Sequence, residues 1–261
     1  MYVISHKDIF RKIIMKLHNL LLISCIALAL SACKTKNEDE TVIPADKLYA
    51  DGIAMLANGK HKKASEEFQK IYFQHPGAEL TPQAEIMEAY SLYLAGEYEE
   101  CIDVCDIFSK LHPMHKDVDY VYYLKALSFY MQISDDEHDQ SRTDNAQLAF
   151  EDVIKRFPQT KYAIDSSLKL DLVNDHLAGS NMNIGRFYLK KNNPIAAAAR
   201  FENVIRDYQT TSHTAEALYR MVESYTMLGL KDEAQKYAAV LGHNYPDSHW
   251  YRGAHALLGK K

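Results

Sequence analysis

The sequence predicts an all-α protein built from about five repeated helical pairs, and three observations support this prediction. Prolines recur along the chain at intervals close to the length of one helical pair. Small and aromatic residues recur at fixed distances before each of these prolines. Ten Gly and seven Pro in 261 residues are too few for the many turns of an all-β fold.

The repeat is defined by a ladder of equivalent positions, which are Pro76, Pro113, Pro158, Gln209 and Pro246. Successive rungs are 37, 45, 51 and 37 residues apart. Twelve residues before the rungs stand small residues, which are Ala64, Cys101, Ala146, Ala197 and Ala234. Eight before stand Phe68, Cys105, Phe150, Phe201 and Ala238, and one before stand His75, His112, Phe157, Tyr208 and Tyr245.

These spacings predict a pair of helices in each unit. Positions twelve and eight before a rung are four residues apart, so they share one helix face and should be buried. Proline cannot continue a helix, so each rung ends a second helix. Gly59, Gly96 and Gly229 lie seventeen before their rungs and mark the turn within a pair. Helix, Gly turn, helix and Pro loop form the tetratricopeptide (TPR) pattern, which predicts a TPR superhelical solenoid of about five helix-turn-helix repeats over residues 45–250.

Two of the intervals contain surplus residues. Between the second and third rungs, Ser134–Thr143 reads SDDEHDQSRT and is predicted to be a solvated loop. A calcium loop is the alternative, but the segment lacks the Gly and the ligand spacing of an EF-hand. Residues 162–191 contain no Pro and predict an unusually long first helix, with Gly179 or Gly185 as points of bending.

Cys101 and Cys105 occupy the small-residue and Phe positions of the second unit, so we interpret them as core side chains. A zinc site with His112 and His115 is the alternative, and a disulfide is disfavoured by the geometry of successive helical turns. His75 and His112 hold a position that aromatic residues fill elsewhere, so they should also be packing residues. We predict no metal site and no cofactor.

The N-terminal segment has the layout of a secretory signal, with four basic residues followed by an apolar stretch from Leu20 to Leu30. Leu30-Ser31-Ala32-Cys33 closes that stretch and resembles the lipobox of bacterial lipoproteins. An ordinary signal peptide with an incidental Cys is the alternative. The resemblance implies a signal peptide at 1–32, a lipid on Cys33, an acylated flexible tether at 33–44 and localisation at the periplasmic face of the outer membrane. The repeat domain would follow, with a C-terminal tail at 251–261; translation could start at Met1 or Met15.

Charge and motif content narrow the class of function. The chain carries a net charge of −5, and because residues 1–32 hold four basic residues and one acidic residue, the remainder carries −8. A chain with this negative charge and scattered Lys and Arg lacks the basic surface that nucleic-acid binding requires. No phosphate-binding Gly loop, nucleophile elbow or zinc-protease helix motif occurs, so we expect a binding protein and not an enzyme.

Several segments carry a closer likeness to a known family. They include 184–191 (IGRFYLKK), 197–201 (AAARF), 216–220 (EALYR), 228–234 (LGLKDEA), 240–251 (VLGHNYPDSHWY), 119–125 (DYVYYLK) and 139–140 (DQ). These segments resemble BamD, the TPR lipoprotein family of the outer-membrane β-barrel assembly machinery, and especially its alphaproteobacterial members. The likeness covers essentially the whole chain after Cys33.

The resemblance implies a lipid-anchored subunit that docks on the periplasmic POTRA region of the barrel protein BamA. It also implies that the subunit works beside other assembly lipoproteins and receives unfolded outer-membrane proteins through their C-terminal signal. Arg200 stands in the family's Asn-Arg-Phe position, which is associated with the BamA-facing surface, and Arg186 lies in the same unit. For both arginines, a solvated ion pair is the alternative role. The chain departs from the family at Pro76-Gly77-Ala78, where members often read Pro-aromatic-Ser, and at Asn181 and Asn183, where members often carry Glu.

Tyrosines on the first helices of units one to three are candidates for a peptide-binding groove, and they are Tyr49, Tyr90, Tyr93 and Tyr123. Outer-membrane barrels typically end in a strand that closes with Phe, and an aromatic groove would suit such a peptide. The alternative is that these tyrosines pack one helix on the next. Two other functions stay open from the residues alone: a general periplasmic TPR adaptor for cell-wall or division enzymes, and a lipid-anchored hydrolase.

Overall fold

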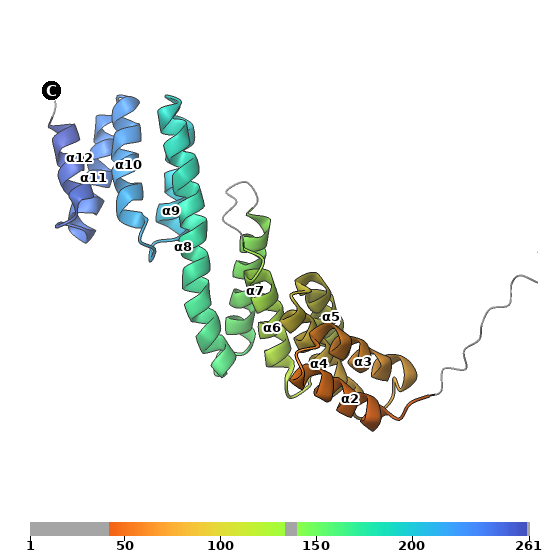
Figure 1. The fold of residues 1–261 in the computed structure, drawn as a ribbon. Coiled ribbons are helices and arrows are strands. Elements are labelled where there is room, and N and C mark those ends of the chain that lie inside the picture. The colour runs from red at the N-terminus through yellow and green to blue at the C-terminus, as the bar shows by residue number, and fades with distance from the viewer. Residues whose placement is uncertain (1–41, 134–139, 260–261) are drawn as a thin grey trace, which may run out of the picture. The chain divides into compact units, whose positions relative to one another are not determined.

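The structure is a computed structural model that describes residues 42–133 and 140–259. Residues 43–261 form one compact unit. Its described part contains eleven helices and no strand, which confirms the all-α class (Figure 1). In chain order they are α2 (Ala45–Ala57), α3 (His61–Gln74), α4 (Thr81–Ala95), α5 (Tyr98–Leu111), α6 (Val118–Tyr130), α7 (Ser141–Arg156), α8 (Lys161–Lys190), α9 (Pro194–Asp207), α10 (Thr214–Met227), α11 (Lys231–Asn244) and α12 (His249–Leu258). No helix among these described residues has the length and apolarity needed to span a membrane.

The helices form five consecutive hairpins, and α12 follows the last of them. Each helix from α2 to α11 packs on the next one in the chain. The first helices of neighbouring pairs also touch, because α6 contacts both α4 and α8. The predicted TPR repeat of helix-turn-helix units is therefore confirmed, and α4, α6 and α8 contribute side by side to one face.

The turn within a pair depends on a residue that tolerates positive φ. Gly59, Gly96 and Gly229 have φ of 69°, 80° and 75°. In the fourth unit the equivalent residue is Asn192, with φ of 57°. Glycine reaches this left-handed region without steric cost, and Asn is among the few other residues that adopt it routinely. Four of the five turns thus share one backbone conformation through two residue types.

The second helix of every pair ends with the same backbone geometry. The capping residues have φ between −126° and −137° and ψ between 42° and 54°, and they are His75, His112, Phe157, Tyr208 and Tyr245. All five stand directly before a rung of the ladder, where a following Pro disfavours the helical region. Tyr208 precedes Gln209 and adopts the same conformation, so the shared geometry does not require the proline. Its ring packs against two neighbouring core clusters, which supplies a tertiary reason to end α9 there.

Inside two of the pairs, a phenylalanine ring of the second helix rests on a glycine of the first. A Cβ built on Gly52 would lie 2.7 Å from Phe68 Cε1, and one on Gly185 would lie 2.4 Å from Phe201 Cε1. Both distances are too short for a real side chain, so only glycine admits the ring. Phe68 and Phe201 are fully buried as a result.

The predicted core positions are confirmed. The small residues twelve before each rung are all fully buried, as are the Phe residues eight before, and these are Ala64, Cys101, Ala146, Ala197, Ala234, Phe68, Phe150 and Phe201. Adjacent repeats share core clusters, so each repeat buries its apolar face against a neighbour.

Cys101 and Cys105 are free and fully buried, which confirms their interpretation as core side chains. Ser128 Oγ donates a hydrogen bond to Cys101 Sγ at 3.2 Å. Hydrogen bonding to Cys101 and burial raise the pKa of the Cys105 thiol well above its usual value. The rings of His112 and His115 lie 5.0 and 5.4 Å from the Phe108 ring, so both histidines pack on an aromatic core residue.

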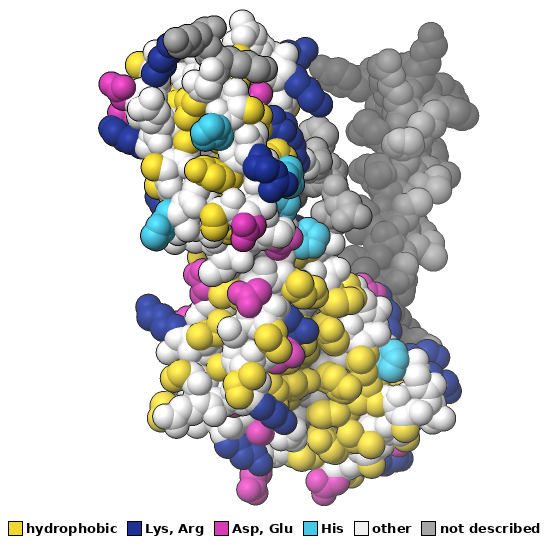
Figure 2. All heavy atoms as spheres, turned by 90° about the vertical axis from the view of Figure 1, so that its left-hand side faces the viewer, with side chains coloured by type: hydrophobic (Ala, Val, Ile, Leu, Met, Phe, Trp, Pro, Cys, Tyr) yellow, Lys and Arg dark blue, Asp and Glu magenta, His cyan; other side chains and the backbone are white. Residues whose placement is uncertain are grey.

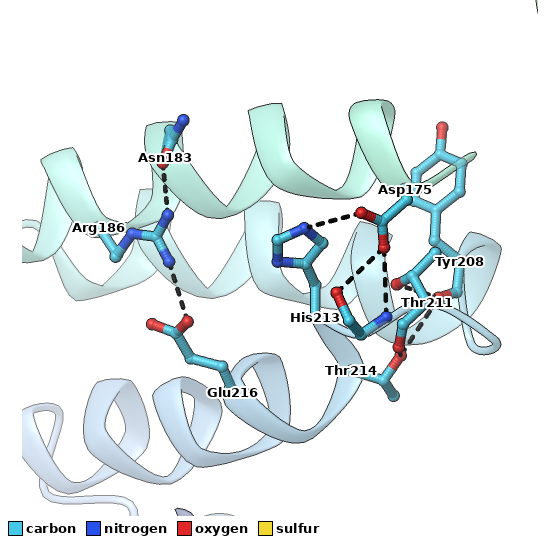
Figure 3. A network of polar contacts seen from close by, with 9 residues as sticks. Asp175, Asn183, Arg186, Tyr208, Thr211, His213, Thr214 and Glu216 are labelled. Atoms are coloured by element: carbon cyan, nitrogen blue, oxygen red, sulfur yellow. Dashed lines mark hydrogen bonds and ion pairs between the residues drawn. The ribbon is translucent and has the colours of Figure 1, made fainter. Parts of the chain in front are cut away.

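Helix α8 is the longest of the described helices, which confirms the predicted long first helix of the fourth unit. It packs on α7, α9 and α6. Asp175 accepts hydrogen bonds from the Ser212 backbone N–H at 3.3 Å and from Ser212 Oγ at 3.1 Å (Figure 3). Gly179 permits the close approach of His213, whose Nε2 would lie 3.3 Å from an added Cβ. These contacts fasten the middle of α8 to the start of α10.

Two predicted boundaries are corrected. Residues 134–139 of the expected loop Ser134–Thr143 lie outside the described residues, but Ser141 opens α7 and Thr143 is buried in it. The expected tail at 251–261 begins inside α12, which packs on α10 and α11. The physical reason is a pair of aromatic contacts: the Tyr251 ring rests on Gly242, and the Trp250 ring lies 5.3 Å from the ring of Tyr219.

We predict that Gly185→Ala destabilises the protein, because the added methyl group must displace the Phe201 ring from a packed core. Overpacking of this kind costs about 1–3 kcal/mol. Gly77→Ala is the matched control, since open space surrounds Gly77 and its φ is not in the left-handed region. Urea unfolding of both variants checks this, and equal midpoints would contradict the proposed ring contact.

Candidate protein-binding site

Tyrosines from three successive first helices meet on one face of the repeats. The Tyr123 and Tyr162 rings stack with centroids 5.1 Å apart, and the Tyr120 ring lies 5.4 Å from that of Tyr162. Tyr90 and Tyr93 of α4 pack against the same core cluster as Tyr120. We call these five residues the aromatic face. It joins α4, α6 and α8, which are the helices that contact one another directly.

One hydroxyl group of the aromatic face is held in an ion-pair network. Tyr123 Oη donates to Asp165 Oδ2 at 2.5 Å, and Asp165 lies 3.4 Å from Lys169 Nζ. Burial and the bond to Asp165 raise the pKa of Tyr123, and burial raises the pKa of Tyr120 and of Tyr93. A half-buried surface of tyrosines suits an extended peptide, because the rings cover apolar side chains and hydroxyls bond backbone groups.

Of the four tyrosines singled out from the sequence, Tyr90, Tyr93 and Tyr123 belong to the aromatic face. Tyr49 lies elsewhere, with its ring 5.4 Å from that of Phe68 in an edge contact. Sequence reasoning missed Tyr120 and Tyr162. The spacing of three residues between Tyr120 and Tyr123 places both on one helix face and was the available signal.

Helix α8 also carries an exposed apolar stripe. Ile164, Leu168 and Leu172 recur every four residues and are 67%, 64% and 54% exposed. Figure 2 shows hydrophobic side chains gathered in the lower part of the view, at the height of α2–α7 in Figure 1. Exposed apolar side chains that cluster in this way mark surfaces for other proteins.

The C-terminal half of α8 borders a different kind of surface. A cavity of about 320 Å³ lies between α8 and α10 and is lined by three basic residues, Arg186, Lys190 and Arg220. Arg186 Nη1 lies 3.0 Å from Glu216 Oε2, and Arg186 Nη2 donates a hydrogen bond to Asn183 Oδ1 (Figure 3). Arg186 therefore forms a partly buried ion pair within the chain. Arg220 shares the same Glu216, at 3.1 Å.

Arg200 lies apart from that cavity. It is half-buried on α9, and within the described ranges its guanidinium forms no ion pair, so the solvated-pair alternative is not found there. The structure thus places Arg186 and Arg200 in different surroundings. No sequence pattern groups Arg220 with Arg186, because they meet only through their shared partner Glu216, which pairs α8 with α10.

Two glutamates on α4 are almost completely buried. Glu85 and Glu88 are each 6% exposed. Gln69 Nε2 donates to Glu88 Oε1 at 3.1 Å, and His112 Nε2 lies 3.1 Å from Glu85 Oε2. Burial raises the pKa of Glu88 to about 7 and also raises the pKa of Glu85, where His112 opposes the shift. No motif in the sequence indicated these carboxyl groups.

Comparison with known proteins places the chain in a family. A family model described as "Outer membrane lipoprotein" (YfiO) matches residues 42–241. Outer membrane protein assembly factor BamD of Rickettsia prowazekii is 62% identical over 89% of this chain and 93% of the relative. The chain belongs to the BamD family. The BamD of Caulobacter vibrioides is 41% identical over 89% of this chain and 78% of its own length, and that of Neisseria meningitidis serogroup A is 30% identical over 88% and 92%.

The two segments that the sequence analysis expects to differ from most BamD proteins have local structural roles. At Pro76-Gly77-Ala78 the Ala78 N–H donates to the His75 carbonyl at 3.0 Å, and Thr81 Oγ1 donates to the same carbonyl at 2.7 Å. The turn is thus closed by backbone and hydroxyl groups without an aromatic residue. Asn181 faces α9 and accepts a hydrogen bond from Asn203 at 3.4 Å, while Asn183 bonds Arg186. Cys33, the expected lipid attachment site, lies outside the described residues.

We predict that the stability of the protein falls as the pH rises through about 7 because of Glu88. The pKa of Glu88 is near 4.5 in the unfolded chain and about 7 in the folded protein, so protonation of Glu88 stabilises the folded state. This contribution is complete below about pH 4.5 and is lost above about pH 7.

Glu88→Gln should remove that dependence, and its stability relative to the wild type should grow by about 3 kcal/mol between pH 4 and pH 8. Glu151→Gln, at an exposed position on α7, is the matched control. Urea unfolding at several pH values checks the prediction. A difference between Glu88→Gln and wild type that stays constant with pH would contradict it.

Proposed function

We propose that this chain is a non-enzymatic lipoprotein subunit of the outer-membrane β-barrel assembly machinery. The observation that carries the proposal is its 62% identity, over nearly the whole length of both chains, to a protein named as an outer membrane protein assembly factor. The repeats support it, because stacked helical pairs present extended surfaces that bind peptides and proteins. The same relatives favour this role over a general adaptor for cell-wall enzymes.

We propose that the two ends of α8 border two separate binding surfaces, one for the barrel protein and one for the unfolded outer-membrane protein. The C-terminal repeats, with Arg200, would hold the POTRA region of a BamA-like barrel protein. The aromatic face would receive the C-terminal segment of an unfolded outer-membrane protein, whose aromatic and apolar side chains suit the tyrosine rings. Helix α8 is one continuous helix that borders both surfaces. An unfolded outer-membrane protein (a client) bound at one end of α8 therefore stays at a fixed distance from the barrel subunit bound at the other end.

Lipid on Cys33 would anchor the subunit at the periplasmic face of the outer membrane. Each buried methylene contributes about 0.8 kcal/mol, so two or more acyl chains give stable attachment. We predict that Cys33→Ala abolishes incorporation of a clickable palmitate. Cys25→Ala, which changes the other N-terminal cysteine, should leave labelling intact. Equal labelling of wild type and Cys33→Ala would refute the anchor.

The contact with the barrel subunit is tested by charge reversal at Arg200. Arg200→Glu should reduce co-purification of a POTRA-containing barrel protein from gently solubilised membranes. The substitution replaces the positive charge that would face the partner by a negative charge, which would repel the partner's complementary surface. Arg206→Glu, on the exposed side of the same helix, is the control and should co-purify normally. Helix content by circular dichroism should match in both. Undiminished recovery with Arg200→Glu would remove this residue from the interface.

Client binding is tested by site-specific crosslinking. A photoreactive phenylalanine analogue in place of Tyr90 or Tyr123 should capture a synthetic peptide from the C-terminus of an outer-membrane barrel, and deletion of the terminal Phe should lower the capture. The analogue at Tyr219, which contacts Trp250 near the C-terminus, is the control. Capture at Tyr219 alone would show that clients bind the opposite end of the repeats.

A further inference from the structure

A groove runs between α3 and α5, with α4 as its floor, on helices that carry neither Arg186 nor Arg200. Two cavities of about 320 and about 150 Å³ adjoin in it. They share three lining residues, Gln69, Glu88 and Val104, so they form one continuous depression. We call it the α3–α5 groove.

One end of the α3–α5 groove is walled by exposed apolar side chains. Tyr72, Phe73 and Ile107 line it and are 39%, 69% and 52% exposed. The Tyr72 and Phe73 rings meet edge to face with centroids 5.3 Å apart, which gives this wall a defined shape. Large apolar side chains held open to solvent beside a cavity are costly for the free protein and mark a contact surface.

The floor of the same end consists of two buried carboxyl groups that have fewer polar partners than they can accept. Glu88 accepts one hydrogen bond, from Gln69, although a carboxylate can accept about four. Glu85 Oε2 is fully buried and accepts no hydrogen bond of good geometry within the described part of the chain, its near neighbour being His112. Burial accordingly raises the pKa of both carboxyl groups. A cation that entered the groove would supply the missing partner.

The other end of the groove is strongly acidic. Four further carboxylates line it, and they are Glu66, Glu97, Glu100 and Asp103. Lys62 is the basic residue among the lining groups, and it is paired with Glu97 at 2.5 Å. The groove as a whole therefore combines a large excess of negative charge with an apolar wall.

We propose that the α3–α5 groove binds a segment of a partner protein that presents a Lys or Arg side chain next to apolar side chains. The methylene stem of the cation would lie along Val104 and Ile107, and its charged end would reach Glu88. The flanking apolar residues would cover Tyr72 and Phe73. Lys and Arg combine an apolar stem with a positively charged end. The apolar wall of the groove complements the stem, and its carboxylates complement the charge.

Other occupants fit the groove less well. An anionic segment would be repelled by the carboxylates at both ends. A purely apolar segment would cover the wall but leave Glu85 and Glu88 further desolvated without a partner, which is unfavourable. A second copy of the chain is distinguished from a separate partner by the experiment below.

The test uses the full-length chain in detergent and two fluorescein-labelled peptides. One peptide reads Gly-Ser-Leu-Phe-Lys-Leu-Phe-Ser-Gly, and in the other norleucine replaces the Lys. Fluorescence anisotropy should show that the wild type binds the Lys peptide about tenfold more tightly than the norleucine peptide. Glu88→Gln should reduce this ratio to near one, while Glu151→Gln, which removes the same charge elsewhere, should preserve it.

The apolar wall is tested by Phe73→Ser, which should weaken binding of both peptides, with Phe187→Ser at another exposed position as its control. Circular dichroism checks that all variants are folded. Equal affinity of the wild type for the two peptides, or a preference that survives Glu88→Gln, would overturn the proposal. So would self-association of the wild type that Phe73→Ser abolishes, because the groove would then bind a second copy.

Discussion

The structure depends on a large side chain of one helix that reaches the backbone of its partner. In the first and fourth repeats this is a phenylalanine ring on a glycine, Phe68 on Gly52 and Phe201 on Gly185. The contact fixes how closely the two helices approach and which faces they turn to the neighbouring repeats. Tyr251 on Gly242 repeats the arrangement between α11 and α12. Because each repeat buries its core only against its neighbours, an error in one of these contacts acts first on the adjacent repeats.

The same packing produces surfaces of different character. Stacking the first helices α4, α6 and α8 brings their tyrosines together into the aromatic face. The length of α8 carries its C-terminal half past α7 to α9 and α10, where Arg186 meets Glu216. On the second helices, α3 and α5 leave the groove floored by Glu88. A repeat architecture thus separates binding surfaces by helix and not by domain, which suits a protein that must hold more than one partner.

The sequence predicted the fold because its signals are local. The fixed spacing to each rung identified the buried positions and the five helix ends. The same backbone conformations occur in the fourth repeat, where Gln209 and Asn192 replace the usual Pro and Gly. The boundaries that were wrong, at Thr143 and after residue 250, depend on tertiary burial that no local spacing encodes. The groove could not be predicted for the same reason, since Gln69, Glu88 and Val104 meet only through the packing of three helices. Arg186 and Glu216 are likewise thirty residues apart.

The central claim is that a repeat with a ring seated on a glycine of its own pair, such as Phe201 on Gly185, is held by that contact and by its immediate neighbours. Native-state hydrogen exchange on Phe201→Ala tests this claim. The loss of a buried ring costs about 3–5 kcal/mol, and protection should fall in α8, α9 and α10 while the amides of α2–α5 keep their wild-type exchange rates. A uniform loss of protection over all repeats, or no loss in α8, would contradict it.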